Sequence, residues 1–369
     1  MPDPARIIRC AIVPMHSAHS GPPRRAVGDI AADLTDGERS LLAYFRAVSY
    51  GAVEFEVWSA ADWHHAGAAR HTADFARAAA DVPGLDLARF DHLIVVVPAH
   101  PAESPGRFRP MGALSALEVG GHPVWAGVSI IEDGPLGVVR PGEPSDRYAG
   151  ALRHELVHAW FGLGHTGRMI CTDQLGRPVP YHPVNQKIET GGVKAGGITM
   201  GTGRFFDVVQ ATVAGFIDPE DERVRTITAA GTSEIEIQAL SVPERGVKTV
   251  RLPVGPTGGA PHVWMEYRRP IGFDADLFEH RRSGLPGAQL IDLDGLLFYT
   301  DGVEQPGHGH LSSILLDMTP GTQRARDDWR VTALHAGRAF IEPVHGTKVE
   351  VLETGPTSCR VRVTAGGVA

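Results

Sequence analysis

The stretch at residues 145–166, SDRYAGALRHELVHAWFGLGHT, decides how the rest of the chain is interpreted. It contains His154, Glu155 and His158 in the pattern H-E-x-x-H. Two histidines four residues apart on a helix project from the same face about one turn apart, so both imidazoles can reach one metal ion. The glutamate beside the first histidine can act as general base on a water at that metal.

The residues around this pattern favour a helix that ends soon after it. Ser145 can cap the first turn, and Asp146 places a negative charge near the positive end of the helix dipole. Gly162 and Gly164 can end the helix by adopting backbone angles that a side chain resists. The chain then reverses and offers His165 as a third ligand. Three neutral imidazoles and a water suit catalytic Zn²⁺, which keeps one coordination position open.

The competing interpretation is a chance match, because the chain holds 18 histidines and a bare H-E-x-x-H is short. The helical context, the two glycines and the third histidine argue against chance. A structural or decayed site remains the alternative to a catalytic one.

Composition limits the possible partners. The chain has 369 residues, of which 43% are hydrophobic, so two packed units are expected. The net charge of -8 and the lack of a basic block make nucleic acid an unfavourable partner. No apolar stretch is long enough to span a membrane, so we do not expect a membrane as a partner. Three widely spaced cysteines, Cys10, Cys171 and Cys359, predict packing roles rather than a disulfide framework.

The first residues, MPDPARIIRCAIVPM, do not resemble a signal peptide, since the apolar run is short and is broken by Arg9. We therefore expect a cytoplasmic protein from the sequence as given, or a secreted one if an upstream segment has been removed.

Hydrophobic periodicity predicts an α/β (α+β) catalytic domain over residues 1–217, with a mixed sheet and the zinc helix across one of its faces. Strands are expected at residues 7–13, 53–57, 92–97 and 124–131, and helices after the possible capping box of Thr35 and Glu38, at 73–80, at 145–161 and at 206–216. Residues 17–30, 98–112 and 166–199 are expected to be loops. Residues 128–131 are expected to pair with an extended peptide at a sheet edge.

The pattern changes after about residue 218, where short β-like runs recur between Gly/Pro turns. An all-β sandwich-like domain is expected over residues 218–369. Val349, Val351, Val361 and Val363 predict a terminal hairpin within it.

With these motifs in hand, the chain resembles the metzincin metallopeptidases, and most closely the gametolysin and immune-inhibitor-A-like group. The resemblance lies in H-E-L-V-H, in Met200-Gly201, which looks like a methionine turn, and in residues 44–57, 263–274 and 315–321. It implies a zinc peptidase with His154, His158 and His165 as ligands and Glu155 as base. It also implies Met200 as a structural floor beneath the metal, and a peptide or peptide-like substrate.

The chain departs from the metzincin pattern at two points. His165 follows His158 by seven residues rather than six, and Gly162 follows it by four rather than three. One added residue rotates the exit of a helix by about 100°, so a bulge or shifted turn is needed to bring His165 to the metal. Otherwise Glu189, Asp173 or His182 would be the third ligand. No tyrosine closely follows Met200, which leaves Tyr181 or His182 as candidates for oxyanion or substrate contacts.

Two other functions fit the same residues. A peptidase-like zinc enzyme of the cytoplasm would tailor one specific peptide or natural product. Alternatively, the β-rich region would bind a peptide or glycan, and the zinc site would be structural or inactive.

Overall fold

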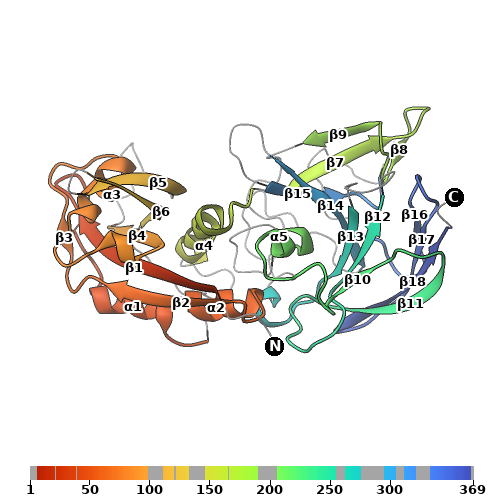
Figure 1. The fold of residues 1–369 in the computed structure, drawn as a ribbon, viewed down its shortest axis with the longest axis horizontal. Helices are drawn as coiled ribbons and strands as arrows, with labels where there is room; N and C mark the ends of the chain where they lie inside the picture. Colours follow the sequence, from red (N-terminus) through yellow and green to blue (C-terminus); the bar gives the residue numbers. More distant parts are fainter. Residues whose placement is uncertain are drawn as a thin grey trace. The chain divides into compact units, whose positions relative to one another are not determined.

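The computed structural model describes residues 6–20, 22–38, 40–98, 111–119, 122–132, 146–164, 166–189, 206–254, 262–275, 295–304, 311–320 and 333–366. It is a mixed α/β protein in which strands predominate (Figure 1). Within the described residues the chain divides into two compact units, the first ending at Gly162 and the second beginning at Leu163. The boundary expected after residue 217 therefore falls inside the second unit.

The first unit is built around a mixed sheet. Its elements are β1 (Arg6–His16), α1 (Val27–Thr35), α2 (Leu41–Val48), β2 (Val53–Ser59), β3 (His64–His65), α3 (Thr72–Ala80), η1 (Leu87–Arg89), β4 (His92–Val97), β5 (Met111–Val119), β6 (His122–Glu132) and α4 (Asp146–Phe161). The strand order is β2-β1-β4-β6-β5, and β3 pairs with the end of β1. All neighbours in this sheet are parallel except β5, which runs antiparallel to β6.

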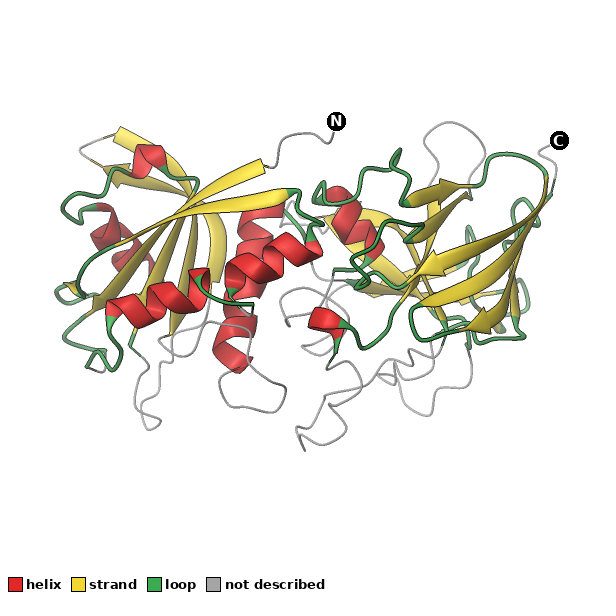
Figure 2. Ribbon diagram, turned by 90° about the horizontal axis from the view of Figure 1, so that it is seen from below, coloured by secondary structure: helices red, strands yellow, loops and turns green. Residues whose placement is uncertain are grey.

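Both faces of this sheet are covered, which explains why its central strands read as unbroken apolar runs. Alternate residues of β1 and β4, such as Val13 and Val95, pack against Phe75 of α3. The residues between them, Cys10 and Ile94, face the opposite way and border a pocket shared with α1, α2 and α4. Figure 2 shows the helices lying along this sheet.

Three predictions about the first unit are wrong. Residues 128–131 do not form an edge, because β6 pairs with β4 on one side and β5 on the other. The segment expected to be a loop at residues 17–30 contains the start of α1. The helix expected after Thr35 is α2, which is capped instead by Ser40, whose hydroxyl accepts the N–H of Ala43 at 3.1 Å.

The second unit contains a larger and a smaller sheet. Its elements are β7 (Gly167–Thr172), β8 (Pro178–Val179), β9 (Gln186–Glu189), α5 (Val208–Val213), β10 (Val224–Thr226), β11 (Gly231–Gln238), β12 (Thr249–Pro253), β13 (His262–Tyr267), η2 (Gly272–Asp274), β14 (Leu296–Glu304), β15 (Leu311–Leu316), β16 (Ala339–Ile341), β17 (Lys348–Thr354) and β18 (Ser358–Ala365). The larger sheet has the order β10-β12-β13-β14-β15-β7-β8, with β9 also paired to β7, and the smaller has the order β11-β18-β17-β16.

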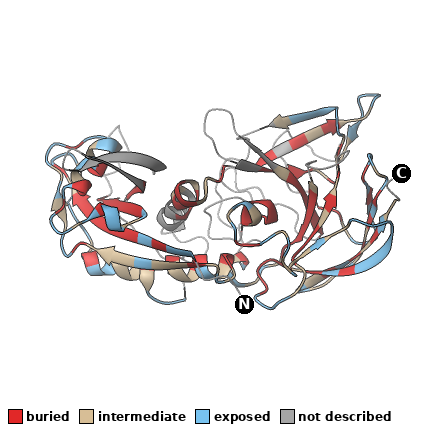
Figure 3. Ribbon diagram, in the orientation of Figure 1, coloured by how far each residue is buried: buried red, intermediate tan, exposed pale blue. Residues whose placement is uncertain are grey.

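Side chains of both sheets form one hydrophobic core. Met265 and Phe298 of the larger sheet belong to the same buried cluster as Ile237 and Val361 of the smaller one. Figure 3 shows buried residues concentrated on β13 and β14, at the centre of the larger sheet. The two sheets share this core, but the larger one also includes β7, β8 and β9, which precede the boundary expected at residue 218.

The terminal hairpin is confirmed, since β17 and β18 pair Val349 with Val363 and Val351 with Val361. The loop expected at residues 166–199 is wrong over its first part, which forms β7, β8 and β9. Cys10, Cys171 and Cys359 are buried and unpaired in disulfides, as expected of packing residues. Among the described helices, none is long and apolar enough to cross a membrane.

Candidate metal centre

The helix α4 carries the H-E-x-x-H residues. It is α-helical from Asp146 to Phe161, so His154 and His158 lie four residues apart on one continuous helix. Four residues correspond to about 6 Å of rise and slightly more than one turn, which places both residues on the same face. Glu155 and His158 are partly exposed, whereas the neighbouring Leu156 and Val157 are fully buried. At this point of the helix the apolar residues face inward, while Glu155 and His158 stay partly exposed.

The end of α4 is set by Gly162. Its backbone has φ of +60°, and its N–H donates to the carbonyl of His158 at 3.2 Å. This left-handed conformation favours glycine, because a side chain would be strained there. The helix is regular up to Phe161, so the residue that exceeds the metzincin spacing is not absorbed as a bulge inside it. It lies among the helical residues between His158 and Gly162, whereas His165 lies outside the described residues.

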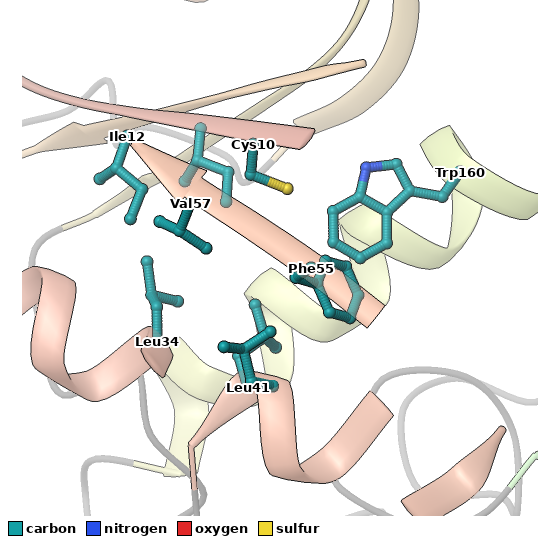
Figure 4. Close-up of a pocket in the computed structure, with 9 residues that line it drawn as sticks. Cys10, Ile12, Leu34, Leu41, Phe55, Val57 and Trp160 are labelled. Carbon is teal, nitrogen blue, oxygen red and sulfur yellow. The ribbon is translucent and has the colours of Figure 1, made fainter. Parts of the chain in front are cut away.

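Trp160 anchors the last turn of α4 in the first unit. Its ring centroid lies 5.2 Å from that of Phe45, 4.8 Å from that of Phe55 and 5.1 Å from that of His92. Figure 4 shows the indole beside Phe55 at the apolar pocket that Cys10 also lines. About two turns earlier, the guanidinium of the fully buried Arg153 lies 5.3 Å from the ring centroid of Tyr44. These ring contacts fix which face of α4 points away from the sheet.

His92 adds a buried polar residue beneath α4. Its Nε2 lies 3.0 Å from the hydroxyl of Ser129 on β6, and burial lowers the pKa of the imidazole to about 3. The ring is therefore neutral at physiological pH. A Cβ at Gly127 would lie 2.2 Å from Nδ1 of His92, so only glycine fits opposite this ring. The sequence signal for His92 was its place at the start of the apolar run HLIVVV. That signal does not identify Ser129 as its partner.

Beyond Gly162, hydrogen bonds rather than ring contacts hold the chain. The carbonyl of Gly164 accepts a hydrogen bond from Nε2 of Gln210 at 3.1 Å. Thr166 donates its hydroxyl to Oδ2 of Asp207 at 3.0 Å, and the hydroxyl of Ser313 donates to the same oxygen at 2.6 Å. Thr166, Asp207, Gln210 and Ser313 are all almost completely buried. Sequence reasoning missed this network, because its members are scattered along the chain.

The same network continues into the start of α5. Asp207 caps this helix by accepting the N–H of Gln210 at 2.9 Å, and Glu266 accepts the N–H of Val208 at 2.7 Å. Arg268 donates to the carbonyl of Phe206 at 2.9 Å. Burial raises the pKa of Asp207 and raises that of Glu266 to about 8. These carboxyl groups lie in a low-dielectric interior, where their hydrogen bonds are strong and directional.

The residues considered as substitute ligands lie in the second unit, where most make local contacts. Asp173 accepts the N–H groups of Leu175 and Arg177 at 2.8 and 2.9 Å and pairs with the Arg177 guanidinium at 2.7 Å. Nδ1 of His182 accepts two backbone N–H groups of the following turn at 3.2 and 2.9 Å. Tyr181 is buried in the core of this unit. In these contacts the carboxylate of Asp173 and Nδ1 of His182 already serve as hydrogen-bond acceptors.

Glu189 is the last residue of β9, where it pairs with Arg168 of β7. Met200 and His165 lie outside the described residues, so the methionine turn and the third ligand stay predictions. Among the described residues, no group of three His, Cys, Asp or Glu side chains is arranged to hold a metal. No family model matches the sequence, and no curated protein matches it either.

Proposed function

We propose that the chain is a zinc-dependent metallopeptidase of the metzincin type, which hydrolyses peptide bonds. One observation carries the proposal: α4 is helical through His154, Glu155 and His158, which places the two histidines on one face of the helix, and it stops at a glycine in the left-handed conformation. A mixed sheet on which such a helix packs agrees with the fold that the resemblance implies.

The donor set fits Zn²⁺. Neutral imidazoles are preferred zinc ligands, and a helical i, i+4 pair supplies two of them without distorting the backbone. His154, His158 and His165 would hold the ion and leave one position open. When bound, Zn²⁺ supplies a Lewis acid that polarises the scissile carbonyl and lowers the pKa of water to about 7.

Glu155 performs the proton transfers in this proposal. Its carboxylate accepts a proton from the attacking water and passes it to the nitrogen of the leaving amine. The partial exposure of Glu155 is consistent with this role, because a general base must be reached by both water and substrate.

The substrate would pair with β5 rather than with residues 128–131. Within the described residues, β5 has a strand neighbour only on its β6 side. An extended peptide that adds to a free sheet edge gains main-chain hydrogen bonds without requiring particular side chains. Among the described strands of this sheet, β5 is therefore an edge strand, next to the strand that sequence reasoning selected.

Glu155→Gln tests the proposal, together with zinc content per chain and cleavage of a peptide library before and after chelation. We expect about one zinc per wild-type chain, and kcat/KM reduced roughly 10²- to 10⁴-fold in the variant, with zinc retained. Glu56→Gln, at an exposed glutamate of β2, is the matched control and should cleave normally.

Full activity of Glu155→Gln would reject the glutamate as base. Bound zinc without cleavage of general protein substrates would favour the dedicated tailoring enzyme. A chain purified without zinc, and unable to take it up, would favour the binding module.

A further inference from the structure

The connections around β1 run along opposite faces of the sheet in the first unit. The chain passes from β1 through α1 and α2 to β2, and from β3 through α3 to β4, which pairs with β1 on its other side. The helices α1 and α2 border the pocket that Cys10 lines, whereas α3 packs on the face that carries Val13. In open α/β sheets, ligands bind outside the carboxyl ends of the strands where the connections reverse in this way. The carboxyl end of β1 is therefore the place in this unit where a ligand is expected.

Three histidines and one arginine gather at this carboxyl end. His16 is the last residue of β1 and pairs with His65, the last residue of β3, which lies beside the end of β1 in Figure 1. Their ring centroids lie 5.0 Å apart in an edge-to-face arrangement. In the segments that follow the two strands, Nε of Arg70 donates to Nε2 of His19 at 3.1 Å.

Main-chain hydrogen bonds hold these two pairs of side chains near each other. The N–H of Gly67 donates to Nδ1 of His65 at 3.0 Å, and the carbonyl of Gly67 accepts the N–H of Ala18 at 3.1 Å. The hydroxyl of Ser17 accepts the N–H of His19 at 3.2 Å, which fixes the turn after β1. Gly67 has φ of +59°, a conformation that favours glycine. The backbone from which these side chains project is thus fixed by the fold itself.

The hydrogen bonds of two histidines determine where their protons lie. A neutral imidazole has one nitrogen that accepts a hydrogen bond and one that donates. Because Nδ1 of His65 and Nε2 of His19 both accept, the donors of the neutral rings are Nε2 of His65 and Nδ1 of His19. Partial burial and the neighbouring His65 lower the pKa of His16, so its ring is neutral at physiological pH and also offers an N–H donor.

These donors suit an anion better than a metal ion. In His65 and His19 the nitrogen with the lone pair already accepts a hydrogen bond, so neither ring presents that nitrogen to a metal. Among the described residues, no three His, Cys, Asp or Glu side chains are arranged to hold a metal. His19, His65 and Arg70 are exposed, and His16 is partly exposed, so a dissolved ligand can reach them.

The charges around the cluster also favour an anion. Arg70 donates to a neutral imidazole, so this contact leaves its positive charge uncompensated. The carboxylate of Asp74 accepts the backbone N–H groups of Arg70 and His71 at 3.2 and 3.1 Å, and it lies 3.7 Å from the guanidinium of Arg77. Those contacts compensate the negative charge of Asp74. Guanidinium groups and N–H donors that converge on one place are typical partners of phosphate oxygens.

We propose that the carboxyl ends of β1 and β3 form a binding site for a phosphate group, either free or carried by a small organic molecule. Arg70 supplies the positive charge, and the imidazoles of His16, His19 and His65 supply N–H donors.

The phosphate site is separate from the candidate metal centre and does not depend on it. The last turn of α4 contacts the other end of the same sheet, where Trp160 packs against His92, the first residue of β4. All residues of the phosphate site belong to the first unit.

Isothermal titration calorimetry of the full chain near neutral pH tests the proposal, with inorganic phosphate and glycerol phosphate as the two probes. We expect saturable binding at one site per chain. Arg70→Gln should weaken it roughly tenfold or more, because a charge-assisted hydrogen bond is lost. His16→Phe, which keeps an aromatic ring against His65, should weaken it about threefold or more. Arg46→Gln, at an exposed arginine of α2 that pairs with Glu54, is the matched control and should bind as wild type does.

The two probes also distinguish the two sources of phosphate. Tighter binding of glycerol phosphate would identify an ester as the ligand, and tighter binding of inorganic phosphate would identify the free ion. Either result supports the site. The absence of saturable binding of both probes, or equal affinity in Arg70→Gln and wild type, would overturn the proposal.

NMR of the imidazole nitrogens locates the site. The signals of His16, His19 and His65 should shift together as phosphate saturates the chain. His182 is the internal control, because its Nδ1 also accepts backbone N–H groups but it lies in the second unit. Shifts at His182 as large as those at His65 would indicate unspecific association with imidazoles and would reject the site.

Discussion

The two regions that adjoin Gly162 hold the chain by different physical means. Before this glycine, α4 is anchored by aromatic packing, chiefly of Trp160 against Phe45 and Phe55. After it, Gly164 accepts a hydrogen bond from Gln210 and Thr166 donates one to Asp207. Aromatic packing depends mainly on buried volume, whereas hydrogen bonds depend on direction. The stability of the first region should therefore depend mainly on side-chain size. That of the second should depend on polar groups, even when a substitution keeps the side chain's shape.

The largest effect is expected for Trp160→Ala. Removing a buried indole from a cluster of rings should cost about 3–5 kcal/mol in the free energy of unfolding, since the cavity cannot collapse completely. Urea unfolding followed by circular dichroism measures the loss. Ile7→Ala, at a side chain that is 45% exposed on β1, is the control and should change stability much less. A loss below about 1 kcal/mol in Trp160→Ala would contradict the importance of size in this region.

Acid should weaken the same region through His92. Its imidazole stays neutral in the folded protein down to a pKa of about 3, whereas in the unfolded chain it gains a proton below about pH 6.5. The unfolded state therefore binds more protons, and stability falls as the pH falls through this window. The loss attributable to His92 is about 2 kcal/mol between pH 6.5 and 4.5.

The measurement is the slope of unfolding free energy against pH, in wild type and in His92→Gln. The variant retains a group able to bond Ser129 but cannot titrate, so its stability should decline less steeply between pH 6.5 and 4.5. Identical slopes in the two proteins would show that His92 is already protonated, or solvated, in the folded state.

A smaller effect is expected for Ser313→Ala in the hydrogen-bonded region. This change removes a 2.6 Å hydrogen bond to Asp207 and very little volume, and it should cost about 1–3 kcal/mol. Ser233→Ala, at an exposed position of β11 in the same unit, should stay within about 0.5 kcal/mol. Thermal unfolding of the two variants, measured side by side, compares them directly. Equal melting temperatures would argue against the importance of direction in this region.

The sequence predicted the fold best where the pattern is local. The apolar run of β4, the alternation in β2 and the valines of the terminal hairpin each reflect the environment of their own strand. The sequence did not predict strand pairing where the partner strand lies in another part of the chain. Residues 128–131 look like an edge strand until β5 pairs with them, and the Gly/Pro-rich segment after residue 166 becomes β7 because β15 supplies a neighbour.

The candidate site shows the same contrast between local patterns, which the sequence predicted, and long-range contacts, which it did not. The spacing of His154, Glu155 and His158 on a helix, and the glycine that ends it, were readable because helical periodicity is local. The contacts of Thr166 with Asp207 and Ser313 span 41 and 147 residues, so no spacing rule reveals them.

The three cysteines, described above as packing residues, also act as natural reporters of local opening. Burial raises the pKa of each thiol, to about 12 for Cys359, so thiolate-directed reagents react slowly while the interior stays closed. Cys10 belongs to the first unit, and Cys171 and Cys359 to the second. The rate at which each thiol becomes alkylated therefore reports how often its own unit exposes its interior, without any engineered label.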